Sequence, residues 1–245
     1  MIRGAYTSIS GIIAAQRRMD VLGNNIANVN TTGFKEALAT QSALGMNVGT
    51  TAGGGYLPLG TLGVATYASG LKDNFLQGPL QTTGVPTDLA VSGDGLFVVG
   101  TPSGPAYTRA GDFVVDATGM LTTQIGQPVL DVTGKPVMIP GGAGSLAVAQ
   151  DGTVQGTGQR IALVSVPAAG LSRIGDNLFA IAGPVTPVAT GQGQVIQGAL
   201  EASNVDLAAA MTEMISVQRS YQLSSRAFSI QDGTLDTTIA LGRVK

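Results

Sequence analysis

Residues 203–242, SNVDLAAAMTEMISVQRSYQLSSRAFSIQDGTLDTTIALG, contain the stronger of the two helical patterns in the chain. Large apolar side chains recur in this stretch every seven residues, which is the spacing of one row in a coiled-coil seam. The members of this row are Leu207, Met214, Tyr221, Phe228 and Leu235. A second row holds Met211 and Ile239, with polar exceptions at Gln218, Ser225 and Asp232. The pattern predicts a helix from about 205 to 241, and Ser203 with Asp206 predicts a capping box at its start.

The same seven-residue period appears in residues 1–30. One apolar row consists of Ile12, Met19 and Ile26, and its partner row consists of Ala15, Leu22 and Val29. This pattern predicts a second helix, and Gly33 follows it as a stop signal. Both stripes are narrow, so each helix needs a partner with a matching stripe. We therefore expect the two helices to pair as a coiled coil.

Amide side chains gather between positions 24 and 30, where the first of these helices should end, at Asn24, Asn25, Asn28 and Asn30. Asn side chains compete for backbone hydrogen bonds, so they are favoured at helix ends and turns. Two roles stay open for this cluster. It forms a turn after the helix, or it makes a direct contact with another chain.

The middle of the chain alternates short apolar runs with Gly- and Asp-containing turn sequences, which is typical of short β-strands. Apolar runs at 88–91 and 96–99 flank a Gly-Asp-Gly sequence, and runs at 113–115 and 120–123 flank an Asp-x-x-Gly sequence. Asp caps such turns and Gly adopts the positive φ that they need, so each pair of runs predicts a hairpin. Because no helical period intervenes, the region predicts an antiparallel sandwich or open barrel.

The predicted fold class is α+β, with N- and C-terminal helices paired as a coiled coil and a central, mainly antiparallel β domain. The expected parts are the N-terminal helix at 1–36, an extended Gly-rich connecting segment at 37–86, the β domain at 87–200 and the C-terminal helix at 201–245. The connecting segment is inferred because no charged residue occurs from Ala37 to Leu71 and glycines are frequent there.

The amino-acid composition argues against several classes of function. The 245 residues include 13 Lys and Arg against 15 Asp and Glu, so no basic surface for nucleic acid is expected. The chain has no His and no Cys, which excludes triads with a His base, thiolate nucleophiles and metal sites made by those ligands. No run approaches the ~18 apolar residues of a membrane span, so no membrane insertion is expected.

The residues that could carry catalysis have simpler explanations. Asp94, Asp116, Asp131 and Asp151 lie in Gly-containing turns, where Asp caps the backbone. The Ser-x-x-Lys sequence at 69–72 lacks the companion motifs of serine hydrolases that use a lysine base. We therefore expect no catalytic, metal-binding or cofactor-binding residue, no cofactor, no small-molecule substrate and no enzyme activity.

Six stretches stand out in order along the chain: Asn24–Lys35 (NNIANVNTTGFK), Asp88–Val99 (DLAVSGDGLFVV), Tyr107–Phe113, Gly175–Phe179, Gln197–Asp206 and Gln218–Tyr221. Together they resemble the bacterial flagellar basal-body rod proteins, a family related to the hook protein. The resemblance spans almost the whole chain. Its length and the sequence Leu241-Gly242-Arg243 favour the proximal-rod type, and the distal-rod type stays open.

The resemblance implies a structural subunit of the flagellar basal body. Members of the family polymerise into the hollow axial rod with their terminal helices paired along the channel. They leave the cell through the flagellar export apparatus without a cleaved signal. The partners implied are copies of this chain, other rod and hook proteins and the export apparatus.

The two stripes and the Asn cluster define the expected assembly interface. Its residues are Ile12, Met19, Leu22, Asn24, Asn25, Ile26, Asn28, Val29, Gly33, Phe34, Leu207, Met211, Met214, Tyr221, Phe228 and Leu235. We expect the terminal helices to be loose in the free chain and to order when neighbours dock.

A secreted β-rich binding protein, such as an adhesin with helical ends, is the alternative function. It would need a recognition groove with aromatic or charged anchors. Only 4% of the residues are aromatic and 11% are charged, which disfavours that alternative.

Overall fold

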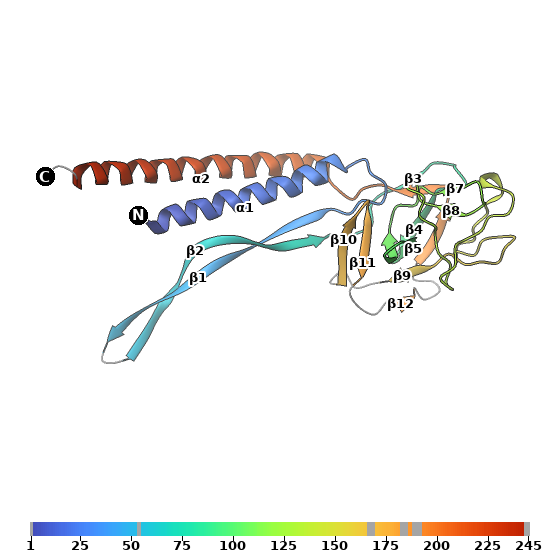
Figure 1. Ribbon diagram of the computed structural model, residues 1–245, viewed down its shortest axis with the longest axis horizontal. Helices are drawn as coiled ribbons and strands as arrows, with labels where there is room; N and C mark the ends of the chain where they lie inside the picture. Colours follow the sequence, from blue (N-terminus) through green and yellow to red (C-terminus); the bar gives the residue numbers. More distant parts are fainter. Residues whose placement is uncertain (1, 53–54, 166–169, 182–185, 188–192, 243–245) are drawn as a thin grey trace. The chain divides into compact units, whose positions relative to one another are not determined.

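The computed structural model describes residues 2–52, 55–165, 170–181, 186–187 and 193–242. The chain forms two compact units (Figure 1). The helical unit is built from Met1–Ala27, Ala37–Asp73 and Asp206–Lys245, and the β unit from Asn28–Glu36 and Asn74–Val205. The expected connecting segment is therefore divided, with its first part in the helical unit and the remainder in the β unit.

The helical unit contains two long helices, α1 (Ile2–Ala27) and α2 (Leu207–Gly242), which pack against each other. They run antiparallel, because Gly4 of α1 lies against Gln231 and Arg18 pairs with Glu213. Both predicted helices are present, and their packing against each other is confirmed.

The start of α2 is capped by Asp206. Its carboxylate accepts hydrogen bonds from the backbone N–H groups of Ala208 and Ala209, at 2.9 and 3.1 Å. The hydroxyl of Ser203 instead accepts the N–H of Val205 at 3.3 Å. The predicted capping box is wrong, because Asp206 is the residue that satisfies the first free N–H groups of the helix.

Residues 37–73 form a long hairpin of β1 (Ala37–Ala52) and β2 (Gly55–Asp73). The strands pair antiparallel from Ala37 opposite Asp73 to Ala52 opposite Gly55, with three register shifts. α1 packs against this hairpin as well as against α2. The sequence indicated extended chain but not the pairing, because small uncharged residues lack the apolar–polar alternation by which strands are predicted.

The β unit is made of short strands whose pairings, within the described residues, are all antiparallel. They are β3 (Leu80–Thr82), β4 (Leu89–Gly93), β5 (Leu96–Thr101), β6 (Gly104–Thr108), β7 (Val114–Val115), β8 (Leu121–Thr122), β9 (Leu163–Ser165), β10 (Leu171–Gly175), β11 (Leu178–Ile181), β12 (Thr186–Pro187), β13 (Gly193–Gln197) and β14 (Ala199–Glu201), with a short 3-10 helix at Ala143–Ser145. Six strands form one sheet in the order β10-β11-β6-β5-β9-β12, and the others pair as β13-β4, β14-β3 and β7-β8.

One predicted hairpin is confirmed and another is wrong. The Asp-x-x-Gly turn at 116–119 joins β7 to β8, and the Asp116 carboxylate accepts the N–H groups of Thr118 and Met120. Across residues 93–95, however, β4 pairs with β13, and β5 pairs with β6 and β9. The apolar runs form strands as predicted, but their partners lie far along the chain, where local spacing cannot find them.

The six-stranded sheet carries apolar side chains on both faces. Side chains alternate along β5, so Phe97 and Val99 join the larger core while Leu96 and Val98 join a second apolar cluster. The buried members of the second apolar cluster are Leu96, Val98, Tyr107, Ala162, Val164 and Phe179. Phe75 covers part of it, with its ring 5.1 Å from that of Phe179.

Replacing Asp206 by Ala removes the acceptor for two N–H groups at the start of α2. We expect the free energy of unfolding of the helical unit to fall by about 1 kcal/mol. Urea unfolding followed by far-ultraviolet circular dichroism measures this loss. Asp232→Ala, at an exposed position within the same helix, is the control and should change stability by less than ~0.5 kcal/mol. Equal losses in both variants would show that Asp206 contributes no cap.

Candidate functional site

The predicted apolar row of α2 is partly covered within the helix pair. Met214, Tyr221, Phe228 and Leu235 are each half-buried. The terminal methyl of Met214 lies 3.9 Å from where a Cβ on Gly23 of α1 would be. Leu207, the first member of the row, is 41% exposed. Most of this row therefore makes a contact within a single chain.

The second row on α2 differs from the predicted one. Its members that lie against α1 or are buried are Ala210, Val217, Ser224 and Gln231. A Cβ on Gly11 would lie 3.2 Å from the Ser224 hydroxyl oxygen, so glycine lets the two backbones approach closely. The predicted members Met211 and Ile239 are 53% and 57% exposed. As a contact within the helix pair this row is wrong, because close helix approach selects small residues rather than large apolar ones.

The two predicted rows of α1 are covered as far as Ile26. Ala15 and Leu22 are buried, and Ile12, Met19 and Ile26 are half-buried. α2 covers one side of α1, where the Arg18 Nε donates to Glu213 at 3.0 Å. The hairpin contacts α1 too, and the N–H of Thr66 donates to the Ser10 hydroxyl at 3.4 Å. Val29 follows the end of α1 and is half-buried in the β unit.

Within the Asn cluster, Asn25 anchors the start of the hairpin. Its Nδ2 donates to the Ala37 carbonyl at 2.8 Å, and its Oδ1 accepts the Ala37 N–H at 3.0 Å. Asn25 is 1% exposed, so it is occupied within its own chain. The Asn28 Oδ1 accepts the Thr31 hydroxyl at 3.1 Å, in the turn after α1. Asn24 and Asn30 are the exposed members of the cluster, and an intermolecular contact stays open for both.

A buried cluster of three charged side chains lies in the β unit, and we call it the ion cluster: Lys35, Arg109 and Glu201. Glu201 Oε1 lies 2.5 Å from Lys35 Nζ, and Glu201 Oε2 lies 3.0 Å from Arg109 Nη1. The Gly78 N–H also donates to Glu201 Oε1, and Lys35 Nζ donates to the Leu76 carbonyl, both at 2.8 Å. Buried charges are tolerated when paired and hydrogen-bonded, and these contacts supply that pairing.

The ion cluster joins three segments that are far apart in the sequence. Lys35 follows α1, Arg109 follows β6, and Glu201 ends β14 shortly before α2. Gly33 brings the first segment into place, since its N–H donates to the Glu201 carbonyl at 2.7 Å. At its φ of 65°, a Cβ would lie 2.3 Å from the Arg109 carbonyl carbon, so only glycine fits.

Phe34 is buried beside the ion cluster. The Arg173 guanidinium lies 4.7 Å from the centre of the Phe34 ring, in cation–π geometry. It also donates to the Lys35 carbonyl at 2.7 Å. Gly33 and Phe34, which were expected in the assembly interface, are thus used inside the β unit.

Burial lowers the pKa of the Lys35 ammonium, because the charged form loses its hydration. The hydrogen bond and negative charge of Glu201 work in the opposite direction, and the charge of Arg109 adds to the lowering. Two cations share one carboxylate in this cluster. The carboxylate of Glu201 therefore offsets part of the cost of burying the charges of both Lys35 and Arg109.

Three family models match successive parts of the chain. Residues 6–35 match "Flagella basal body rod protein", residues 90–156 match "Flagellar hook protein FlgE/F/G D1 domain", and residues 196–241 match "Flagellar basal body rod FlgEFG protein C-terminal". The flagellar basal-body rod protein FlgG of Bacillus subtilis is 36% identical, over 99% of this chain and 100% of its own length. The chain belongs to the flagellar basal-body rod protein family.

Other relatives of the rod protein agree with this assignment. FlgF of Rhizobium meliloti is 34% identical over 98% of this chain and 97% of its own length. FlgG of Borreliella burgdorferi is 36% identical over 96% of this chain and 97% of its own length. The rod protein is therefore a structural subunit of the flagellar basal body, while its subtype stays open. Each of the three matched segments contributes one member of the ion cluster.

Two further features of the rod protein's described residues bear on its site. They contain no helix that is long and apolar enough to cross a bilayer. They also contain no group of three or more His, Cys, Asp and Glu side chains placed to hold a metal ion.

Sequence reasoning about the rod protein missed the ion cluster, although all three of its members stand inside the motifs that carry the family resemblance. The available signal was charge: only 11% of the residues are charged, so a Lys, an Arg and a Glu inside these motifs were conspicuous. Their pairing was not predictable, because they lie far apart along the chain and meet only in the folded β unit.

Glu201→Gln leaves Lys35 and Arg109 buried without a negative partner. We expect the free energy of unfolding of the β unit to fall by about 3–5 kcal/mol, because breaking a buried pair strands a charge. Lys35→Met should cost less, since it leaves one cation with one carboxylate. Denaturant unfolding followed by near-ultraviolet circular dichroism measures both losses.

Glu213→Gln is the matched control for this test. It removes the partner of Arg18 in a half-exposed ion pair, whose contribution should be below ~1 kcal/mol. If Glu201→Gln were as mild as Glu213→Gln, the ion cluster would not be the tie that we infer.

Proposed function

We propose that this rod protein polymerises with copies of itself and with other flagellar axial proteins through outward-facing apolar residues of α1 and α2. The product is a hollow axial filament that transmits torque. The observation that supports this proposal most is the apolar surface that the helix pair leaves uncovered. Its members are Tyr6, Ile9 and Ile13 on α1, and Leu207, Met211, Ile215, Leu223, Ile230 and Ile239 on α2.

These exposed side chains gather at both ends of the helix pair. Because Gly11 lies against Ser224, the α1 group at residues 6–13 is beside the second half of α2. The group at 207–215 is beside the other end of α1. Met211 and Ile230 are nineteen residues apart, or about 28 Å along the axis. Two unlike apolar ends favour a head-to-tail contact, which repeats without closing and gives a filament.

The helix pair is held weakly within one chain. Among the described side chains of α2, only Ala210 and Val217 are buried. Most helical stability in proteins comes from packing rather than from propensity, so a long helix with so little buried surface gains stability when neighbours cover it. This supports the inference that the terminal helices order fully, as a coiled coil, in the assembled state.

Two parts of the proposal rest on the family resemblance. We infer that the chain passes through the flagellar export apparatus without a cleaved signal. We also infer that its role is mechanical rather than enzymatic. The antiparallel β unit with its filled core and buried ion cluster fits a load-bearing body.

Ile215→Asp tests the outward-facing contact. A charge at this exposed position should block polymerisation, because burying an unpaired carboxylate is costly, while the secondary structure of the monomer stays unchanged. Electron microscopy of concentrated protein and circular dichroism of dilute protein give the two measurements. Gln222→Asp adds the same charge at an exposed polar position of α2 and is the control. Filaments of normal length from Ile215→Asp would contradict the proposed contact.

Tyr221→Asp places a charge inside the helix pair instead. We expect it to separate α2 from α1 and to block polymerisation, while the β unit keeps its near-ultraviolet circular dichroism signal. Normal assembly by this variant would show that the half-buried row of α2 is dispensable.

Amide hydrogen exchange compares the free and assembled states. We expect weak protection across 2–27 and 207–242 in dilute protein and strong protection of the same residues in filaments, because neighbouring chains supply the missing burial. The larger core of the β unit serves as the internal reference and should be protected in both states. Strong protection of both helices in the dilute monomer would contradict the proposal.

A further inference from the structure

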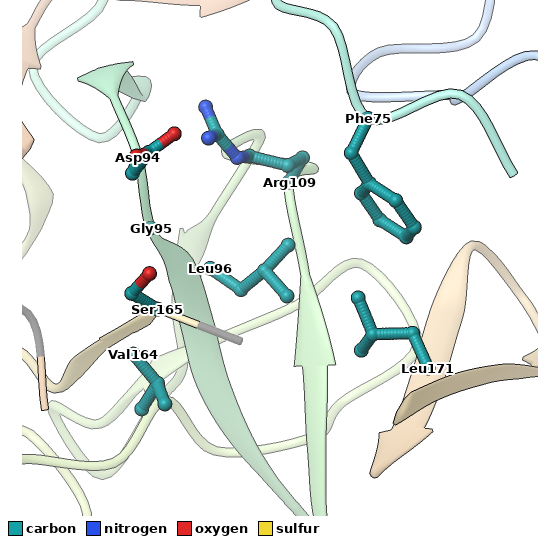
Figure 2. A pocket seen from close by; sticks show the side chains of 8 residues that line it. All are labelled: Phe75, Asp94, Gly95, Leu96, Arg109, Val164, Ser165 and Leu171. Carbon is teal, nitrogen blue, oxygen red and sulfur yellow. The ribbon is translucent and has the colours of Figure 1, made fainter. Parts of the chain in front are cut away.

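A pocket of about 390 Å³ lies over the second apolar cluster of the β unit. Its apolar lining includes Phe75, Leu96, Val164 and Leu171. Figure 2 shows the guanidinium of Arg109 and the carboxylate of Asp94 together toward one end, with Leu96, Val164 and Leu171 farther along. The pocket thus combines a charged end with an apolar body.

Arg109 brings an unsatisfied donor to this pocket. Its side chain is 6% exposed, and its Nη1 and Nη2 donate to the carbonyls of Val91 and Gly93 at 3.2 and 2.7 Å. Its Nε–H is buried and finds no acceptor among the residues that the structure describes. A buried donor without an acceptor costs free energy, so an acceptor that reached Nε would be favoured.

The net positive charge of the ion cluster also favours an acceptor that is an anion. Glu201 is the carboxylate that both Lys35 and Arg109 contact, so the cluster holds two cations for one anion. The Nε–H edge of a guanidinium, which it shares with one Nη, is also the edge that receives a carboxylate through two parallel hydrogen bonds. An anion entering the pocket would supply the missing acceptor.

We propose that this pocket binds a carboxylate carried on an apolar body of about the size of an aromatic side chain. The carboxylate lies against the Nε–H edge of Arg109, and the apolar body lies against Leu96, Val164 and Leu171. Two sources share this chemistry: a free organic acid, and the carboxyl-terminal residue of a polypeptide chain. The site lies in the β unit and is independent of the helix contacts that carry polymerisation.

The carboxylate of Asp94 determines whether a substitution at this position should tighten or weaken binding of an anion. Asp94 is exposed at the charged end of the pocket, where its carboxylate would repel an incoming anion. Asp94→Asn should therefore tighten binding of a carboxylate. A pocket that accepted a cation would respond in the opposite direction.

The experiment titrates the intact protein with 3-phenylpropionate and follows the Arg109 Nε–Hε signal by nuclear magnetic resonance. We expect a saturable downfield shift of this signal. Acetate, which lacks the apolar body, and 3-phenylpropanol, which lacks the charge, should each bind at least about tenfold more weakly. Arg109→Lys keeps the positive charge but removes the Nε–H edge, and it should weaken 3-phenylpropionate by about tenfold or more.

Because Arg109→Lys also alters the ion cluster, Asp94→Asn gives the independent test in a variant outside that cluster. Tighter binding to Asp94→Asn supports the proposal, and weaker binding overturns it. Absence of a saturable shift in the unmodified protein, or equal binding of the alcohol, overturns it as well. N-acetylphenylalanine serves as the second arm: if it binds more tightly than 3-phenylpropionate the occupant is a polypeptide chain end, and if it binds more weakly the occupant is a free acid.

Discussion

The carboxylate of Glu201 is the group on which the organisation of the β unit depends. It is buried between Lys35 and Arg109 and accepts a backbone N–H from Gly78 in addition. Removing charges from water is costly, so such a cluster is weak evidence for high stability. Its value lies in specificity, because each buried charge is satisfied only when all three segments are in place. The segments that lead out of α1 and into α2 are thereby held to one body.

The helix pair follows a different physical rule from the β unit. Close approach of α1 and α2 selects small residues, such as Gly11 against Ser224, and this leaves large apolar residues such as Met211 and Ile215 outside. A soluble monomer gains nothing from exposed side chains of that size. A subunit of a filament does gain, because its neighbours cover them. The inner surface of the pair therefore sets helix spacing, and its outer surface provides the proposed contacts between subunits.

The low charge of the chain makes the position of each charged side chain informative. Asp116 caps a turn, Asp206 caps α2 and Arg173 lies over the Phe34 ring, so these charges have local structural roles. Arg109 is different, because one of its donors stays unsatisfied at the wall of a pocket. That difference is the reason for inferring a ligand there and not at the turn carboxylates.

Local patterns in the sequence are enough to predict the two helices and the β character of the middle region, because both depend on local periodicity and on turns such as the one at Asp116. The sequence also located the motifs of the family. It did not determine the strand partners, the β1–β2 hairpin, the second row of the helix contact or the ion cluster. Tertiary structure decided these, since β4 meets β13, and Lys35 meets Glu201, only when distant segments come together. The period of large apolar residues revealed one row of the helix contact, at Met214, Tyr221, Phe228 and Leu235. It did not reveal the other row, at Ala210, Val217, Ser224 and Gln231, because small and polar side chains give no apolar period in a sequence.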